Sequence, residues 1–360
     1  MGRAVRLAEQ EQAERVLGLV TDPDMPAQVG YRTSEQITEW LSHRTGERWT
    51  IDVRSDPLTA DHRTSEDLLD AVDRHRDEQG WDFGICLTDL PLLLAKGALL
   101  ADVSTGRRVA LVSLPALGAI RTYHRTYRLL TRLLDDLLPH HLSGPPTDPG
   151  TVRRTHRDGP VDVRYTTPRL RGWVRLVSGM VRANRPWQLV WGLSSALAAA
   201  LAAAGFGLFT STVWQLGDVL SPLRALTTSV FALSLMTVWL IASHGLWERV
   251  GRRAIRDRRL ALLYNTSTIT TLSLGVACLY ALVYLVSLAG AATLLDAGVL
   301  ARVLGHPVDW AAYARLAWMV ASMALVAGAL GSSLETDAAV RQAAYGYREE
   351  QRRAQHAEAG

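Results

Sequence analysis

The sequence predicts a small, largely parallel three-layer α/β domain followed by an all-α bundle of four transmembrane helices. Three observations support this fold class. Strand-like and helix-like patterns alternate over residues 1–142, and long charge-free apolar runs fill the second half. A segment rich in proline, glycine and charge separates the two. A chain of 360 residues has room for two or three such parts.

Residues 1–142 are expected to form the α/β domain. Strands are expected at 15–24 (RVLGLVTDPD), 48–53 (RWTIDV), 82–87 and 108–118 (RVALVSLPALG), where apolar residues alternate or run together. Helices are expected at 34–44, with Ser34 as the N-cap, and at 64–80, with acidic residues in the first turn and Gly80 at its end. A last helix is expected at 121–138.

Residues 143–168 (SGPPTDPGTVRRTHRDGPVDVRYTTP) are expected to be a linker, because proline, glycine and charge are concentrated there. Residues 169–186 are expected to form a basic amphipathic helix along the inner leaflet, since apolar residues share one helical face and arginines the other. The alternative is a helix that packs on the α/β domain. The lipid-contact candidates are Arg169, Arg171, Trp173, Arg175, Arg182 and Arg185.

Four runs without Asp, Glu, Lys or Arg predict the membrane bundle. They cover residues 186–215, 225–247, 260–295 and 316–334, and each is long enough to cross ~30 Å of hydrocarbon. The bundle is expected at 187–334, with spans near 188–210, 226–247, 268–293 and 313–333, followed by a tail at 335–360. The absence of charge inside these four runs argues against a coupled transporter.

The distribution of arginine predicts the orientation. Arginines are concentrated before the first span, between the second and third spans and in the tail, whereas the two opposite loops hold only Arg224, Arg302 and Arg315. Positive charge accumulates on the cytoplasmic side, so both termini are expected in the cytoplasm of a bacterial cell, with the bundle in the inner membrane. Residues 1–20 lack an apolar core preceded by basic charge, and no signal peptide is expected.

Several expected strands end in Asp or Ser beside proline, in the stretches TDPD, SDP, TDLP and SLP. Ligands of open parallel sheets bind at the carboxyl ends of strands. Asp22, Asp24, Asp89 and Ser113 are therefore candidates for a carboxylate site at one sheet edge. Asp and Pro are also ordinary turn-forming residues after strands, and the turn interpretation is favoured.

Motifs for cofactor and metal binding are missing from the sequence. It has no Walker A loop, no glycine-rich dinucleotide turn, no Gly-x-Ser-x-Gly elbow and no His/Cys set with zinc spacing, so neither a cofactor nor a metal is expected. Cys86 and Cys278 lie in separate regions and form no disulfide framework. The basic charge is assigned to membrane lipids, and no nucleic-acid partner is expected.

Two resemblances rest on short motifs. The stretches CLTDLP (86–91), ADVS (101–104), VALVSLPALGA (109–119), NRPW (184–187) and YGYREEQRR (345–353) resemble an uncharacterised family of multi-pass membrane proteins from high-GC bacteria. Members are sometimes labelled methylenetetrahydrofolate dehydrogenase. Such dehydrogenases use a Tyr-x-x-x-Lys pair, but Leu92 lies four residues before Lys96, and the motifs do not support that label.

The order of LTDLP, RRVALVSL and a following helix is also similar to the middle of archaemetzincin-type zinc peptidases. Those need His-Glu-x-x-His on the helix, and the sequence here is HRTYR (124–128). Arg125 is no general base and Arg128 no zinc ligand at neutral pH. This resemblance implies at most a relative without activity.

The expected function is that of a non-enzymatic scaffold or regulatory module in the inner membrane. One alternative is an enzyme at the membrane surface that uses the strand-end carboxylates. The other is a small channel or flippase-like bundle. Anionic inner-leaflet lipids and a protein of unknown identity are the expected partners, and small-residue faces such as AAALAAAG (198–205) and the row Ala324, Gly328 and Ser332 favour a packed bundle or a homo-oligomer.

Overall fold

The chain divides into two compact units, Met1–Ala183 and Asn184–Gly360. The computed structural model describes residues 14–56, 64–94, 97–138, 153–156, 161–248 and 255–334. The expected tail at 335–360 therefore lies outside the described residues.

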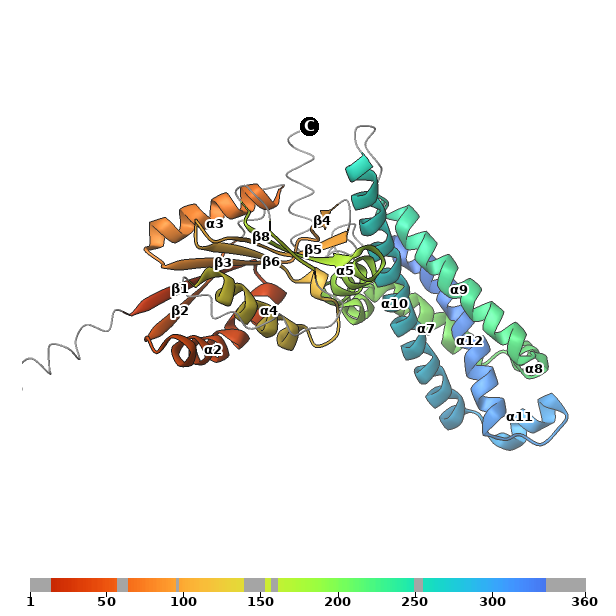
Figure 1. Cartoon of the computed structure of the whole chain (residues 1–360). Coiled ribbons are helices and arrows are strands. Elements are labelled where there is room, and N and C mark those ends of the chain that lie inside the picture. The colour runs from red at the N-terminus through yellow and green to blue at the C-terminus, as the bar shows by residue number, and fades with distance from the viewer. Residues whose placement is uncertain are drawn as a thin grey trace, which may run out of the picture. The chain divides into compact units, whose positions relative to one another are not determined.

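The first unit is an α/β fold built around one mixed sheet (Figure 1). Its elements are β1 (Arg15–Thr21), α2 (Met25–Thr45), β2 (Trp49–Ser55), α3 (Ser65–Gln79), β3 (Phe83–Thr88), β4 (Leu93–Leu94), β5 (Gly97–Ser104), β6 (Val109–Ser113), η1 (Pro115–Leu117), α4 (Thr122–Leu137), β7 (Arg153–His156), β8 (Val163–Pro168) and α5 (Arg169–Ala183). The strand order is β2-β1-β3-β6-β5-β8-β7, with β4 paired to β5.

Only part of this sheet is parallel. Strands β2, β1, β3 and β6 run parallel, whereas β5 pairs antiparallel with β6, β8 with β5, and β7 with β8. The expectation of a largely parallel sheet was therefore correct for the first half alone. Helix α3 covers one face of the parallel part, and α2 and α4 cover the other (Figure 1). Strands β3, β5 and β6 are buried along their whole length, which shows that both faces of the sheet are covered there.

Local signals explain the ends of the helices. The α3 helix ends at Gly80 in the left-handed region and has acidic residues in its first turn, as the sequence predicted. It begins where Thr64 and Asp67 form a reciprocal capping box. The α4 helix also has the predicted bounds to within one residue. The prediction for α2 was wrong at its start: the helix begins at Met25, with Pro26 in its first turn, and Ser34 lies inside it.

The expected linker at 143–168 holds two strands, β7 and β8, which corrects that prediction. Every second side chain from Val161 to Thr167, a segment that includes most of β8, is buried. This alternation is the period of a strand with one covered face. The first unit therefore extends to Ala183, well beyond the boundary expected at residue 142.

The helix expected at 169–186 is α5, and it packs on its own unit. Its contact face consists of small residues: a methyl group at Gly179 would lie 2.3 Å from the carbonyl oxygen of Pro115, and one at Gly172 would lie 3.0 Å from Ala98. Leu176 is fully buried beside them. Because only glycine permits this close approach, Gly172 and Gly179 fix α5 against β5, β8 and η1.

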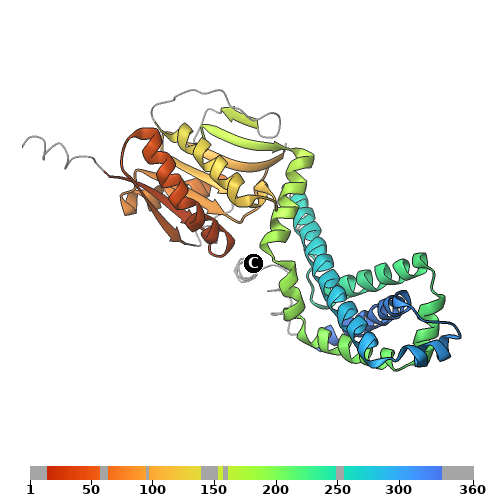
Figure 2. The ribbon, with the colours of Figure 1, turned by 90° about the horizontal axis from the view of Figure 1, so that it is seen from below.

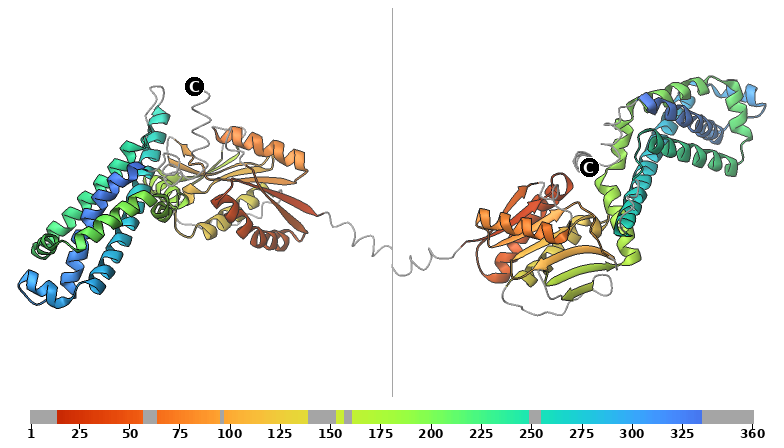
Figure 3. Two further views of the ribbon diagram at one scale, coloured as in Figure 1. Left: turned by 180° about the vertical axis from the view of Figure 1, so that it is seen from behind. Right: turned by 90° about the horizontal axis from the view of Figure 1, so that it is seen from above.

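The second unit is entirely helical in its described residues. Its elements are η2 (Pro186–Gln188), α6 (Leu189–Gly192), α7 (Ser194–Leu208), α8 (Ser211–Val219), α9 (Pro222–Ser243), α10 (Ile255–Leu294), α11 (Ala297–Leu304), α12 (Trp310–Gly331) and η3 (Ser332–Leu334). The long helix α10 runs beside α9 and α12 (Figure 2). The short helices α8 and α11 lie together at one end of this unit (Figure 3).

Three helices are long and apolar enough to cross a membrane: Pro222–Ser243, Arg258–Leu294 and Trp310–Gly331. The predicted first span near 188–210 is not one helix, which corrects the count of four unbroken spans. It is interrupted at Leu193, where the chain bends by 54°. Helix α7 alone has 15 residues and measures about 22 Å, so it reaches across ~30 Å of hydrocarbon only together with its bent partner.

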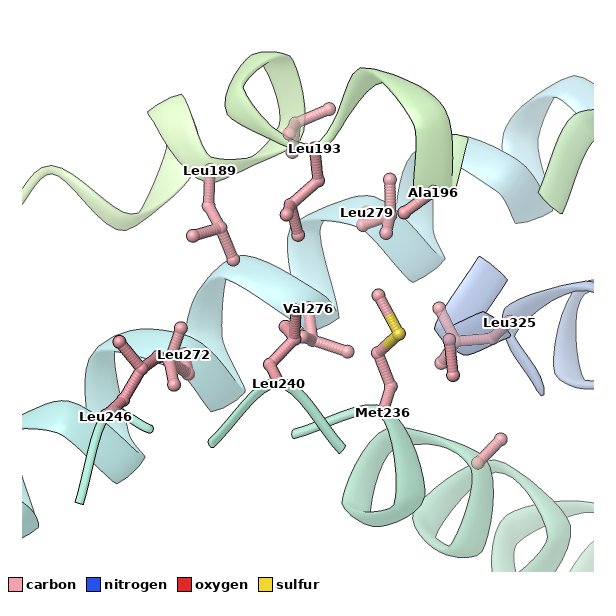
Figure 4. Packing of buried hydrophobic residues seen from close by; sticks show 13 residues of the cluster. Leu189, Leu193, Ala196, Met236, Leu240, Leu246, Leu272, Val276, Leu279 and Leu325 are labelled. Carbon is pink, nitrogen blue, oxygen red and sulfur yellow. The ribbon is translucent and has the colours of Figure 1, made fainter. Parts of the chain in front are cut away.

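The interior of the second unit contains two clusters of buried apolar residues. Figure 4 shows Leu189 and Leu193 directed toward Val276 and Leu240, with Met236 and Leu325 completing the layer. Small residues let α7 and α12 approach closely, since a methyl group at Gly328 would lie 3.0 Å from the carbonyl oxygen of Ala196. The row Ala324, Gly328 and Ser332 is buried inside the bundle, and thus serves the packed bundle rather than an open face.

Candidate functional site

The strand-end candidates lie along one edge of the sheet, because β1, β3 and β6 are parallel neighbours. Asp22 follows β1, Asp89 follows β3, and Ser113 is the last residue of β6. Asp24 lies directly before α2. The structure therefore brings three of the four candidates to adjacent strand ends.

Asp22 is the buried centre of this edge, with 1% of its surface exposed. Its Oδ2 atom accepts a hydrogen bond of 2.7 Å from the hydroxyl of Thr88 and one of 3.1 Å from the backbone N–H of Asp89. Its own N–H donates to the carbonyl oxygen of Leu87. A carboxylate with these partners joins the end of β1 to the turn after β3.

Ser113 has a similar role on the next strand. Its hydroxyl donates to the carbonyl oxygen of Leu90 at 2.6 Å, and the N–H of Leu114 donates to the carbonyl oxygen of Thr88. Thr88 completes the network, because its Oγ1 atom also accepts from the N–H of Leu90 at 2.9 Å. Sequence reasoning missed Thr88, although it lies inside the TDLP stretch that was singled out.

Asp24 differs from the other three candidates. Its side chain is exposed and does not cap α2, and its backbone has φ 64° and ψ −120°. This region is accessible to glycine and costs other residues ~1–3 kcal/mol. Asp24 thus combines a strained backbone with an exposed carboxylate, two residues after the buried Asp22. Asp89 is half-buried and contributes its backbone N–H to Asp22.

Three further carboxylates form hydrogen-bonded contacts, called ties below, between elements on the antiparallel side of the sheet. None of these contacts was expected from the sequence. Asp102 on β5 is fully buried and makes two hydrogen bonds of 2.6 Å with Arg164, its direct neighbour on β8. Asp136 on α4 contacts Arg154 and accepts a hydrogen bond from the hydroxyl of Tyr165. Burial, together with this hydrogen bond, raises the pKa of Tyr165.

The third tie closes the turn between β5 and β6. Asp162 accepts hydrogen bonds of 2.6 and 2.7 Å from the N–H and hydroxyl of Thr105. Partial burial opposes ionisation of Asp162, but the hydrogen bonds from Thr105 and Gly106 outweigh it and lower the pKa. All three ties connect residues that lie far apart in the sequence, so spacing along the chain gives no sign of them.

Among the described residues, no three His, Cys, Asp or Glu side chains are grouped so that they could hold a metal ion. Cys86 is buried in β3 and Cys278 is half-buried in α10, and neither forms a disulfide. The HRTYR stretch lies in α4, where His124 and Arg128 are exposed and Arg125 donates to the carbonyl oxygen of Leu117 at 2.5 Å. Arg125 thus occupies the position at which the peptidase motif requires a glutamate.

The lipid-contact candidates of α5 are distributed over its outer surface. Arg169, Arg171 and Arg182 are exposed, and Trp173 and Arg175 are half-buried. The apolar side chains of Leu170 and Val174 are 79% and 60% exposed. Arg185 belongs to the second unit, where it is half-buried just before η2. The structure therefore leaves α5 with a mixed apolar and basic outer face, while its glycine face contacts the sheet.

A charged cluster lies in the second unit where α8 and the turn after α11 come together. Asp218 accepts from His306 at 2.6 Å through Oδ2, and Arg315 lies 3.0 Å from Oδ1. The hydrogen bond with Asp218 raises the pKa of His306, and the same bond holds the pKa of Asp218 below its usual range. This cluster is outside the segments that could cross a membrane, apart from Arg315 in the second turn of α12.

Comparison with known protein families finds no matching family model, and neither a curated protein nor a solved structure matches the chain.

Proposed function

We propose that this chain is an integral protein of the bacterial inner membrane whose first unit works in the cytoplasm as a non-enzymatic scaffold or regulatory module. The observation that carries the non-enzymatic part is the bonding of Asp22. The buried carboxylate at the strand ends accepts hydrogen bonds from Thr88 and Asp89, and Ser113 donates to Leu90. These groups hold the turns together, as the turn interpretation requires.

The surface of the second unit supports the membrane location. Large apolar side chains are exposed along its long helices, among them Phe231, Val238, Leu274, Leu285 and Leu330. Such a surface is unfavourable in water over several helices and favourable in hydrocarbon. The arginine distribution then supports cytoplasmic termini, with the turns around Asp218 and His306 on the opposite side of the membrane.

Reporter fusions test the orientation. A reporter fused after Gly360 should be active only if it works in the cytoplasm, and one inserted at Gly305 only if it works outside. Gly305 suits the insertion because it is exposed, has a positive φ and ends α11. A cytoplasmic signal at Gly305 would contradict the proposed topology.

We propose that α5 contacts anionic lipid of the inner leaflet through its outer face. Leu170 and Val174 supply apolar surface, and each neighbouring arginine contributes about 1 kcal/mol near an anionic surface. Single cysteines at positions 170 and 174, in a chain without Cys86 and Cys278, should react more slowly with a water-soluble maleimide in phosphatidylglycerol vesicles than in phosphatidylcholine vesicles. A cysteine at exposed Glu78 on α3 is the control. Equal rates at positions 170 and 174 in the two vesicles would exclude the anionic contact.

One observation favours the second candidate, an enzyme at the membrane surface. The strained backbone of exposed Asp24 lies at the sheet edge where ligands of open α/β folds bind. In a strain that lacks the gene, any defect should be restored equally by the wild-type chain and by the Asp24→Ala variant. A variant that accumulates normally but fails to restore the defect would favour the enzyme.

A further inference from the structure

A cavity of about 340 Å³ lies between α8, α9, α10 and α12 in the second unit. Leu226 and Met319 form part of its apolar lining, and Trp318 and Tyr284 form an aromatic wall. The volume is at the lower end of the ~300–1,000 Å³ that is usual for small-molecule sites. The cavity is therefore large enough to hold part of a ligand rather than single waters.

The aromatic wall is held in place by hydrogen bonds and ring contacts. The indole N–H of Trp318 donates to the hydroxyl of Ser229 at 2.6 Å and to the carbonyl oxygen of Ala225 at 3.1 Å. The ring of Tyr284 meets Trp318 edge-on, with 5.9 Å between the ring centres. At the inner end, the hydroxyl of Ser322 donates to the carbonyl oxygen of Trp318. These polar groups bond to each other, so the wall presents mainly apolar and aromatic surface to an occupant.

Among the described residues that line the cavity, Arg315 is the one with a charged side chain. Asp218 contacts the guanidinium through a single oxygen, because its other oxygen accepts from His306. One carboxylate thus faces two basic groups, and the Arg315 side chain remains 43% exposed. A guanidinium has five N–H donors, so donors are left for an anionic oxygen.

If α12 crosses the membrane as proposed, the cavity begins near the level at which lipid headgroups meet hydrocarbon. Arg315 lies five residues after the start of α12, or about 8 Å along the helix, and Ser322 lies about 10 Å deeper. Leu226, on the α9 side of the lining, is 53% exposed on the apolar surface of the unit. An occupant with an apolar chain and an anionic group would reach both ends of the cavity from the bilayer itself.

We propose that this cavity holds the part of one acyl chain nearest the headgroup of an anionic phospholipid, whose phosphate oxygens bind Arg315. The proposal rests on the proposed membrane location, and it adds a specific lipid site in the leaflet on the side of α8 and α11. It also accounts for the presence of an arginine within the second turn of an otherwise apolar helix.

Photolabelling of the full chain tests the proposal. The chain is reconstituted in phosphatidylcholine vesicles with a trace of phosphatidylglycerol that carries a diazirine on its acyl chain, and labelled peptides are identified by mass spectrometry. Labels should concentrate on the cavity-lining parts of α9 and α12. The Ala314→Phe variant fills the cavity and should lower this labelling about tenfold. Ala311→Phe is the matched control, since Ala311 is exposed on the same helix and does not line the cavity.

The headgroup is tested with a phosphatidylcholine probe that carries the same acyl chain. Wild type should prefer the phosphatidylglycerol probe, and Arg315→Gln should lose about fivefold of that preference. Arg302→Gln is the control, because Arg302 is exposed on α11 and bonds to Gly298. Equal labelling by the two probes in wild type would overturn the proposal of an anionic lipid.

Other outcomes separate the cavity from the membrane location. Thr228→Phe fills the cavity from α9, so it replaces Ala314→Phe if that variant does not fold. Labelling that spreads over all apolar surfaces and is unchanged in the filled variant would overturn the lipid site. A chain that alkaline carbonate removes from membranes would contradict the proposed location, whereas an embedded chain without label in the cavity would contradict only this inference.

Discussion

Substitution of Asp22 distinguishes most directly between a structural and a catalytic strand edge. Asp22→Ala removes the acceptor of two donors, the fully buried Thr88 hydroxyl and the part-buried N–H of Asp89. A buried donor without an acceptor costs ~1–3 kcal/mol, and the part-buried one costs less. We therefore expect Asp22→Ala to lower the free energy of unfolding by about 2–5 kcal/mol.

The assay is thermal unfolding of the first unit, expressed as residues 1–183 and followed by circular dichroism. For a domain of this size, a loss of 1 kcal/mol lowers the melting temperature by ~2–4 °C, so a loss in the middle of the expected range lowers it by ~7–14 °C. Asp24→Ala is the matched control, because its exposed side chain does not cap α2. Asp24→Gly should stabilise the unit by up to ~1–3 kcal/mol, since glycine adopts its backbone conformation without strain.

Divalent cations add the functional test. If Asp22, Asp24 and Asp89 formed a metal site, Mg²⁺ or Ca²⁺ would raise the melting temperature, and Asp22→Ala would abolish the increase. We expect no increase in the wild type, because Asp22 is already hydrogen-bonded to the turn after β3. A gain of several degrees that the substitution removes, or an Asp22→Ala variant as stable as wild type, would refute the structural interpretation.

Three further predictions follow from the sheet and the charged cluster. Residues 1–183 should be soluble and melt cooperatively. Residues 1–142 should aggregate, because that fragment lacks β7, β8 and α5 and leaves an edge of β5 open. A soluble fragment 1–142 would contradict this prediction. Asp102→Ala should destabilise the unit by ~3–5 kcal/mol in chemical denaturation, since it leaves the Arg164 guanidinium unpaired. The double variant Asp102→Leu/Arg164→Met should recover most of this loss. An equal loss of stability in the single and the double variant would contradict the pairing. The pKa of His306 is raised in the fold, so its stabilising contribution is complete below about pH 6.5 and disappears as pH rises through the raised value. The melting temperature of the full chain in detergent should therefore exceed that of the His306→Asn variant at acidic pH alone. A difference in melting temperature that stays constant with pH would refute this linkage.

The elements that the sequence predicted well are those whose signals are local. Helix α3 carries its own start at Thr64 and its own end at Gly80, and β3 is a short buried apolar run. Strand β5 was not expected from the sequence, and its buried carboxylate, Asp102, needs a partner from elsewhere in the chain. That partner, Arg164, comes 62 residues later, and β8 was itself missed because Pro and Gly dominate the segment before it.

The sequence indicated where the candidate residues lie in the sheet, but not the hydrogen bonds that they form. Parallel pairing of β1, β3 and β6 brings Asp22, Asp89 and Ser113 to one edge, which follows from the order of strands and helices. The choice of Thr88 as the partner of Asp22 depends on strand register and side-chain direction, which no local pattern encodes. The break at Leu193 was missed for the same reason, since composition reports apolarity and not backbone conformation.

The pairing of β5 with β8 has a consequence for synthesis on the ribosome. About 60 residues separate the two strands, so at ~5–20 residues per second β5 waits ~3–12 s for its second neighbour. Throughout that interval a fully buried strand of the finished sheet has one open edge. Only about 20 residues lie between β8 and the first apolar helix, so the sheet closes just before membrane targeting can begin. A delay in translation before β8 has emerged from the ribosome would therefore prolong exposure of β5, and one after its emergence would not.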